Sequence, residues 1–249
     1  MKHVFRYLMR EAVEAGSTVR LSPTDSHHLA RVVRKASGEV IELIDPVGRL
    51  WPATVVEAGP PTFVKVADEA RGLPPAPVFL YQGLAEWGRL DMVVEKAAEL
   101  GVAEVVFFVS ERARRVPAPD AWRRRRERLA RVVESAARQA GRGHLTRVRG
   151  LLPLDAVFGE IPQGEGLLLD SRGDRMFSEA VADLAAGART ARIVVGPDTG
   201  FSEAELSAAR AAGLSVCMVG PATLRSETAA LVGMSLTLGV VGGLDGAAP

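Results

Sequence analysis

Arg225 and Glu227 are the two neighbouring residues whose chemistry best suits a reaction centre in this chain. A guanidinium stays charged at physiological pH, so Arg225 could stabilise negative charge on a substrate oxygen but could not act as a base. Glu227 could assist or orient that group. An acidic residue in the first turn of a helix is also favoured by the helix dipole, so a structural role is equally well supported. Thr228 has the same two interpretations, a hydroxyl contact or a first-turn residue.

These residues follow the second of two similar segments that predict a ligand site. An apolar strand at 192–195 precedes the loop GPDTG at 196–200, and a second strand at 215–219 precedes the loop GPATLRS at 220–226. Parallel sheets bind ligands outside the carboxyl ends of their strands, and glycines let backbone approach a ligand closely. We expect both loops to lie side by side with the loop that follows 169–170. The alternative is that they are ordinary turns.

Helix signals follow each loop. Ser202 and Glu205 predict a capping box, and Ser226 is expected to cap the last helix. The apolar residues of that helix recur at spacings of three and four, which predicts one buried face. The residues expected on this face are Ala230, Leu231, Met234, Leu238 and Val241.

The two loops carry a resemblance to a known family. VGPATLRSETAAL is similar to the motif LGxRILRxETA, and IVVGPDTGFSEAEL to IGPEGGFxxxE, of the RsmE-type methyltransferases of the SPOUT superfamily. Further matches are DSHHLARVVRKASGEVIELID, RLDMVVEKAAELGV at 89–102 and ESAARQAGR at 134–142, so the resemblance covers almost the whole chain. It implies methylation of N3 of a uridine in small-subunit (16S) ribosomal RNA, with S-adenosyl-L-methionine as cofactor.

The resemblance also implies roles for individual residues. Arg225 would stabilise the uracil anion and Glu227 would assist or orient it. The residues expected to bind the cofactor are Leu169, Asp170, Val195, Gly196, Pro197, Asp198, Gly200, Val219, Gly220, Leu224 and Thr228. Those expected to bind RNA are His28, Arg31, Arg34, Arg112, Arg114, Arg115 and Arg142.

Positive charge is concentrated in one segment, although the net charge of the chain is only +1. Residues 111–149 hold 13 arginines and 4 acidic residues, an excess of nine positive charges. A run of arginines is often just a solvated helix face. An excess this local, with little acid nearby, favours an electrostatic site for phosphate.

The chain divides into two predicted domains. Residues 1–73 are predicted to form a small β-rich barrel with strands at 40–44, 51–57 and 62–67. A helix is predicted at 26–35, with Leu29, Val32 and Val33 facing inward. The Pro-rich stretch 72–77 is the expected linker. The resemblance implies a PUA-like RNA-binding barrel at 1–73 and a SPOUT methyltransferase domain at 74–249.

The second domain alternates strands with helices, which predicts an α/β fold with a parallel sheet. The expected strands are 78–83, 104–109, 145–149, 166–170, 192–195 and 215–219, and the expected helices are 89–100, 121–140, 176–186, 202–212 and 227–241. Sequence rules favour an open, unknotted sheet. The resemblance implies instead a trefoil knot at the C-terminal end.

Several classes of protein and site are not expected. The chain has no apolar run long enough to span a membrane, no signal peptide pattern and neither of the common glycine-rich nucleotide motifs. Cys217, the single cysteine, is expected to be a buried structural thiol. His27 and His28 are adjacent and lack metal-ligand spacing, so no metal is expected. We expect a cytoplasmic protein, and the resemblance implies a homodimer that acts on ribosomal RNA or the small ribosomal subunit.

Four positions depart from the family pattern: Glu86 replaces a basic residue, Asp198 a glutamate, Thr199 a glycine and Ala222 an arginine. Two alternatives stay open. One is ribose 2′-O-methylation of transfer or ribosomal RNA, against which the HHLARVVR segment and the ETA motif argue. The other, which Thr199 and Ala222 support, is a catalytically weak relative that binds RNA.

Overall fold

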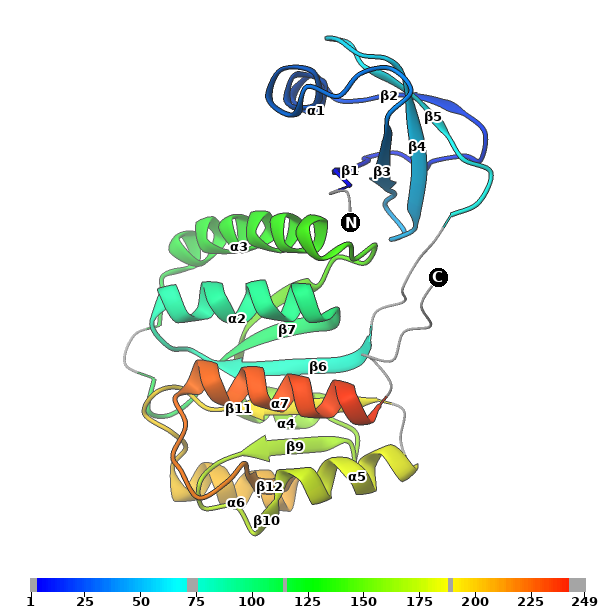
Figure 1. The fold of residues 1–249 in the computed structure, drawn as a ribbon. Helices are drawn as coiled ribbons and strands as arrows, with labels where there is room; N and C mark the ends of the chain where they lie inside the picture. Colours follow the sequence, from blue (N-terminus) through cyan, green and yellow to red (C-terminus); the bar gives the residue numbers. More distant parts are fainter. Residues whose placement is uncertain (1–3, 71–75, 114–115, 188–189, 242–249) are drawn as a thin grey trace. The chain divides into compact units, whose positions relative to one another are not determined.

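A computed structural model describes residues 4–70, 76–113, 116–187 and 190–241 of the chain (Figure 1). The described residues form two compact units, one built from residues up to 70 with Ala137–Leu145 and the other from the remainder. The predicted boundary between residues 73 and 74 lies outside the described residues. It therefore stays a prediction.

The first unit is built on a five-stranded sheet, which confirms the expected β-rich domain. Its strands are β1 (Arg6–Leu8), β2 (Thr18–Arg20), β3 (Val40–Ile44), β4 (Leu50–Glu57) and β5 (Phe63–Val66), in the order β1-β3-β4-β5-β2. Strands β1 and β3 pair in parallel, and the other neighbours are antiparallel. The short β1 and β2 were not predicted, because three residues are too few to show an alternating pattern.

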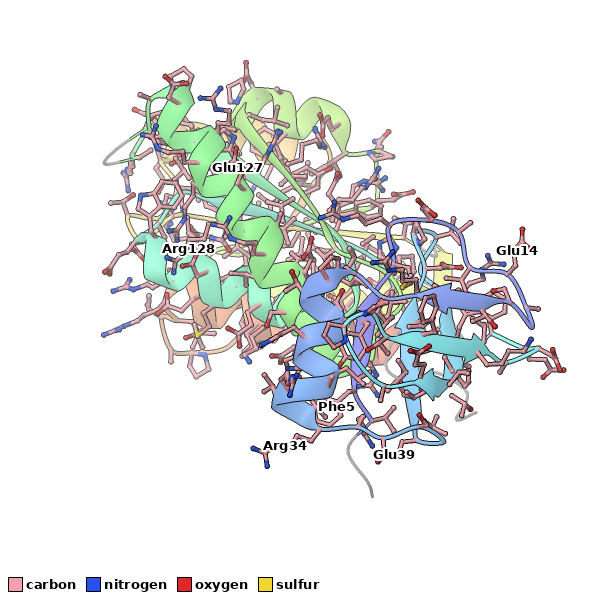
Figure 2. The ribbon with its side chains drawn as sticks, turned by 90° about the horizontal axis from the view of Figure 1, so that it is seen from above. Phe5, Glu14, Arg34, Glu39, Glu127 and Arg128 are labelled. Carbon is pink, nitrogen blue, oxygen red and sulfur yellow. The ribbon has the colours of Figure 1, made fainter. Side chains whose placement is uncertain are left out.

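The helical segment of this unit differs from the prediction. An α-helix, α1 (Pro23–His27), continues into a π-helix, η1 (His28–Val33), which ends at Arg34 in the left-handed conformation. Leu29 is fully buried as expected, but Val32, predicted to face inward, is 64% exposed. A π-helix winds more widely than an α-helix, so spacings of three and four no longer select one face. Figure 2 shows the Arg34 side chain pointing away from this segment.

The second unit contains a seven-stranded sheet in which every neighbouring pair is parallel. Its strands are β6 (Ala76–Gly83), β7 (Val102–Val109), β8 (Arg147–Pro153), β9 (Gly166–Leu169), β10 (Arg175–Met176), β11 (Ala191–Val195) and β12 (Ser215–Met218), in the order β10-β12-β9-β11-β6-β7-β8. Because all strands run the same way, their carboxyl ends share one edge. The predicted α/β class and parallel sheet are confirmed, and the trefoil knot stays a prediction.

Helices cover both faces of this sheet (Figure 1). They are α2 (Trp87–Leu100), α3 (Pro119–Ala140), α4 (Leu154–Glu160), α5 (Phe177–Gly187), α6 (Glu203–Ala211) and α7 (Ser226–Val240). Helices α2, α5 and α7 lie on the near face in Figure 1, and α4 and α6 lie on the far face, where Phe108, Phe158 and Phe201 belong to one buried apolar cluster. No helix in the described parts of the chain is long and apolar enough to cross a membrane.

Several element boundaries correct the sequence prediction. Helix α4 and strand β10 were missed, and the strand expected at 145–149 begins later and runs further, as β8. Strand β6 begins at Ala76 and includes Pro77, which the sequence assigned to the linker. Proline is tolerated near the start of a strand because a missing N–H costs least there. Gly101 does end α2, in the left-handed conformation, and the capping box of Ser202 and Glu205 is present.

Helix α7 also departs from the prediction. It begins at Ser226, one residue early, and Ser226 does not cap it. Its buried apolar residues include Ala230, Met234 and Leu238, as expected. Leu231, however, is 38% exposed. Val241 follows the helix and is only half-buried. Gly233 and Thr237 are buried in their place, because the small residues allow close contact with the sheet.

Candidate functional site

A cavity of about 510 Å³ lies at the carboxyl edge of the seven-stranded sheet. Three loops line it, at 169–172 after β9, 195–201 after β11 and 219–226 after β12. Strands β11 and β12 are not neighbours, because β9 lies between them. The two Gly-Pro loops thus face one cavity from either side of the β9 loop.

The residues expected to bind the cofactor line this cavity, with one exception. Those in its wall are Leu169, Asp170, Val195, Gly196, Pro197, Asp198, Gly200, Val219, Gly220 and Leu224. Thr228 is exposed and lies outside the wall. The role of each in binding stays a prediction.

Glycines fix how closely these loops pack. A Cβ on Gly83 would lie 2.5 Å from the backbone nitrogen of Pro197, and one on Gly196 would lie 2.9 Å from the Phe201 ring. A Cβ on Gly220 would meet nothing within 4 Å. The backbone at Gly83 and Gly196 is therefore packed against the protein, whereas at Gly220 it is open to a ligand.

Ser226 joins two of the cavity's segments. Its hydroxyl donates a hydrogen bond to the carbonyl oxygen of Gly196 (2.5 Å) and accepts one from Nε2 of Gln82 (2.8 Å). The start of α7 is thereby tied to the GPDTG loop and to the end of β6. The sequence prediction missed this role. The available signal was Gln82, a polar residue at the end of an apolar, buried strand.

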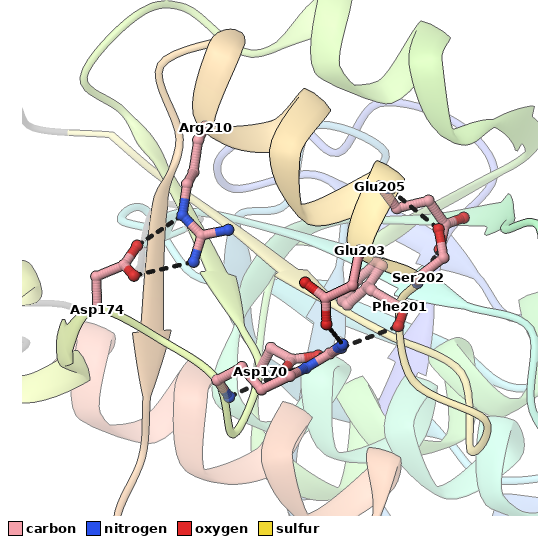
Figure 3. A network of polar contacts seen from close by, with 8 residues as sticks. Asp170, Asp174, Phe201, Ser202, Glu203, Glu205 and Arg210 are labelled. Carbon is pink, nitrogen blue, oxygen red and sulfur yellow. Dashed lines mark hydrogen bonds and ion pairs between the residues drawn. The ribbon is translucent and has the colours of Figure 1, made fainter.

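Arg172 connects the loop after β9 to the start of α6, and Figure 3 shows its partners Asp170, Phe201 and Glu203. It binds both carboxylate oxygens of Asp170 at 2.8 Å, Glu203 at 2.6 Å and the carbonyl oxygen of Phe201 at 2.9 Å. Burial alone would raise the pKa of Asp170, but the hydrogen bonds from Arg172 outweigh it and the pKa is lowered. Asp170 is therefore held as a carboxylate. The sequence prediction did not identify Arg172.

The two predicted catalytic residues lie in different environments. Arg225 is exposed in the cavity wall and, among the described residues, forms no ion pair. Glu227 is 8% exposed and is not part of the wall. Its Oε1 lies 3.7 Å from Nε of Arg89, and its Oε2 is buried without a hydrogen bond. Arg225 therefore lies in the cavity wall and Glu227 outside it, and the catalytic role of each stays a prediction.

Two further arginines line the cavity. Arg89, in α2, was not predicted as a site residue and forms a hydrogen bond with Asp198 (2.8 Å). Arg112 was predicted to bind RNA, and its backbone carbonyl accepts a hydrogen bond from Thr199. Arg112 therefore lies in the wall of the cavity, and its role in RNA binding stays a prediction.

The other described residues expected to bind RNA belong to the first unit. His28, Arg31 and Arg34 are exposed in the first unit, where Nδ1 of His28 is 3.1 Å from the hydroxyl of Tyr7. Burial raises the pKa of that hydroxyl to about 12. Arg142 is partly buried. Arg114 and Arg115 lie outside the described residues.

Helix α3 lies within the arginine-rich segment 111–149. Arg125 packs against Trp87, with its guanidinium 4.8 Å from the centre of the Trp87 ring. Arg123, Arg124, Arg126, Arg128 and Arg131 are exposed. Figure 2 shows Glu127 and Arg128 on this helix. Within the described ranges, no group of three or more potential metal-ligating side chains is present.

Comparisons with known proteins agree with this arrangement. A family model described as an RNA methyltransferase domain matches residues 73–238, and one described as an RNA methyltransferase PUA domain matches residues 21–67. Ribosomal RNA small subunit methyltransferase E of Mycobacterium tuberculosis is 32% identical over 238 residues, 92% of this chain and 87% of that protein. The protein of that name from Bacillus subtilis is 24% identical over 94% of this chain and 95% of its own.

A solved structure shares the fold. Ribosomal RNA small subunit methyltransferase E from Neisseria gonorrhoeae, bound to S-adenosyl methionine, superposes with a TM-score of 0.78 at 24% identity and covers 96% of this chain and 98% of its own. At this identity the match shows the fold alone. The chain belongs to the ribosomal RNA small subunit methyltransferase E family, the RsmE-type RNA methyltransferases of the SPOUT superfamily.

Proposed function

We propose that this enzyme transfers a methyl group from S-adenosyl-L-methionine to N3 of a uridine in 16S ribosomal RNA. The observation that carries the proposal is a single cavity lined by both Gly-Pro loops and by Arg225. The names of the relatives, and the cofactor in the Neisseria gonorrhoeae structure, support it.

The cavity fits the cofactor in size and character. Its volume lies within the range of about 300–1,000 Å³ typical of small-molecule sites. Val195, Leu224 and Phe201 supply apolar wall, and the backbone at Gly200 and Gly220 has open space beside it. When bound, S-adenosyl-L-methionine supplies an electrophilic methyl group on a sulfonium. The residues of the cavity wall would hold it through backbone and apolar contacts.

Arg225 has the properties that the methyl acceptor requires. N3 of uracil carries a proton at neutral pH, so the N3–H bond must break, with the proton passing to water, as N3 takes the methyl group from the sulfonium and the sulfur keeps the electron pair of the sulfur–methyl bond. The negative charge then spreads onto the carbonyl oxygens of the base, and a cationic donor at those oxygens lowers the barrier. Arg225 is exposed in the cavity wall and has no carboxylate partner in the described structure. Its donors are therefore free for the base.

RNA binding would use both units. The exposed arginines of α3 carry charge suited to phosphate, and the first unit carries the PUA domain match. We take residues 1–73 as the RNA-binding barrel and 74–249 as the methyltransferase domain. The substrate would be ribosomal RNA or the small ribosomal subunit in the cytoplasm.

We also propose a homodimer. Leu231, Leu236 and Val240 expose 38%, 43% and 47% of their surface on one helix, α7, which suits an apolar contact with a second copy. Sedimentation should give twice the chain mass, and Leu236→Asp should halve it. A monomeric wild-type protein would contradict this part of the proposal.

Nucleoside mass spectrometry tests the reaction. Small ribosomal subunits from cells that lack this modification are incubated with the enzyme and S-adenosyl-L-methionine, and the RNA is digested. We expect 3-methyluridine from the wild type and about 100-fold less from Arg225→Gln, because one lost oxyanion donor costs about 10²–10³ in rate. Arg147→Gln is the matched control, since Arg147 is exposed at the opposite, amino-terminal end of its strand.

The other outcomes identify the alternatives. A 2′-O-methylated nucleoside in the digest would indicate the ribose methyltransferase. Calorimetry without detectable cofactor binding would indicate the catalytically weak RNA-binding relative.

A further inference from the structure

Arg89 meets carboxylates from three separate segments of the chain. Its Nη1 donates a hydrogen bond to Oδ1 of Asp198 in the GPDTG loop (2.8 Å). Its Nε lies 3.6 Å from Oε2 of Glu86, just before α2, and 3.7 Å from Oε1 of Glu227, in the first turn of α7. These segments follow β6, β11 and β12, so one guanidinium joins the loops of three strands at the carboxyl edge of the sheet.

The burial of Glu227 makes this contact important. The Glu227 side chain is 10% exposed, and a carboxylate so far out of water needs a compensating charge. Among the residues that the structure describes, Arg89 forms the one ion pair of Glu227. The Nε contacts are longer than a normal hydrogen bond, so charge rather than a shared proton holds Glu227. The hydrogen bond to Asp198 fixes the guanidinium itself.

The position of Glu227 determines that of Arg225. The two residues flank Ser226, at the start of α7, and Ser226 is in turn bonded to Gly196 of the GPDTG loop. A shift of Glu227 would therefore move the Arg225 backbone and disturb the same loop that Asp198 occupies. Glu86 and Asp198, two of the four departures from the family pattern, both contact Arg89. Both carboxylates therefore belong to the group of acidic side chains around Arg89.

We infer that Arg89 is a positioning residue: it holds the cofactor loop, through Asp198, against the turn that carries Arg225, through Glu227. Loss of Arg89 should affect cofactor binding and methyl transfer together. This inference rests on the proposed function for its kinetic consequences. Its structural consequences appear in the protein without cofactor.

The test compares Arg89→Met, Arg89→Lys and Lys96→Met. Lys96→Met is the matched control, because Lys96 is a cation of the same helix whose ion pairs, among the described residues, are with Glu95 and Glu99. Amide hydrogen exchange without cofactor should be faster in Arg89→Met at 198–200 and 226–229 and unchanged in Lys96→Met. In assays, kcat should fall about 10- to 100-fold in Arg89→Met, and Arg89→Lys should recover part of it.

A double-mutant cycle distinguishes positioning from general destabilisation. If Arg89 acts through Glu227, the effects of Arg89→Met and Glu227→Gln on kcat will not add in the double variant. Additive effects, or wild-type exchange at both segments in Arg89→Met, would overturn the inference. Because exchange needs neither cofactor nor RNA, this outcome is separate from failure of the proposed reaction.

Discussion

The hydroxyl of Thr199 donates a hydrogen bond of 2.9 Å to the backbone carbonyl of Arg112. This bond joins the GPDTG loop to the loop after β7. A second hydrogen bond holds the loop after β7 in place: the backbone N–H of Glu111 donates to the carboxylate of Glu205 at 2.7 Å. A glycine at 199, as in the family pattern, could not form it. The departure at this position therefore gives the chain a contact that places Arg112 at the cavity.

Thr199→Val should raise the KM for RNA without changing the affinity for the cofactor. The substitution keeps the shape of the side chain but removes the donor, and a hydrogen bond is worth about 1 kcal/mol. We expect about a fivefold higher KM for RNA, measured by methyl transfer at saturating cofactor. Thr199→Ser keeps the donor and should behave like the wild type. Equal KM values for all three proteins would show that the bond does not position Arg112.

Gly83→Ala should disturb the cavity by displacing the GPDTG loop. The new Cβ would lie 2.5 Å from the nitrogen of Pro197, a backbone atom that cannot move without shifting the GPDTG loop. Overpacking of this kind costs about 1–3 kcal/mol. Thermal denaturation should show a lower Tm, and calorimetry should show weaker cofactor binding.

Gly88→Ala provides the control for that substitution. Gly88 lies in α2, and a Cβ there would meet nothing within 4 Å. Alanine favours a helix over glycine by about 0.5–1 kcal/mol, so this variant should be slightly more stable than the wild type. If Gly83→Ala had the same Tm and the same cofactor affinity as Gly88→Ala, the close packing of Gly83 on Pro197 would contribute to neither.

Arg172→Met should destabilise the protein in a pH-dependent manner. Hydrogen bonds from Arg172 lower the pKa of Asp170 against the raising effect of its burial. A lowered carboxyl pKa contributes stability above the ordinary value of about 3.9, and this contribution is lost as pH falls through the lowered pKa. Urea denaturation should therefore show the largest difference between the two proteins near neutral pH. A difference that persisted unchanged under strongly acidic conditions would exclude this linkage.

The exposed arginines of α3 should determine the salt dependence of RNA binding. Arg124, Arg128 and Arg131 follow a spacing of four and three, so they share one side of the helix. Replacing all three with Gln should reduce the slope of log Kd against log salt concentration by about 2–3, since each phosphate contact contributes about 0.7–0.9. Cofactor affinity should stay unchanged.

Glu127→Gln should strengthen the binding of RNA to α3. Glu127 lies among these arginines in α3, and its removal raises the local positive charge by one (Figure 2). RNA binding at low salt should become tighter. If neither variant changed the slope, α3 would be a solvated face and not an RNA surface.

The sequence alone determined the local features of this protein. Strand Val40–Ile44, the capping box at Ser202 and the end of α2 at Leu100 depend on nearby residues, and each formed as predicted. The two Gly-Pro loops were also recognisable, because the α/β pattern fixes which ends of parallel strands share an edge. The loops that line the cavity could therefore be named before the order of the strands was known.

Only the tertiary structure decided which distant side chains meet. Nothing in the local pattern brings Arg89 to Asp198 and Glu227, 109 and 138 positions away, or Arg172 to Glu203. For the same reason Ser226, which local rules assign to helix capping, bonds instead to Gly196 and Gln82. Periodicity describes one element at a time, whereas these contacts follow from the order in which the strands pack and the loops close at their ends.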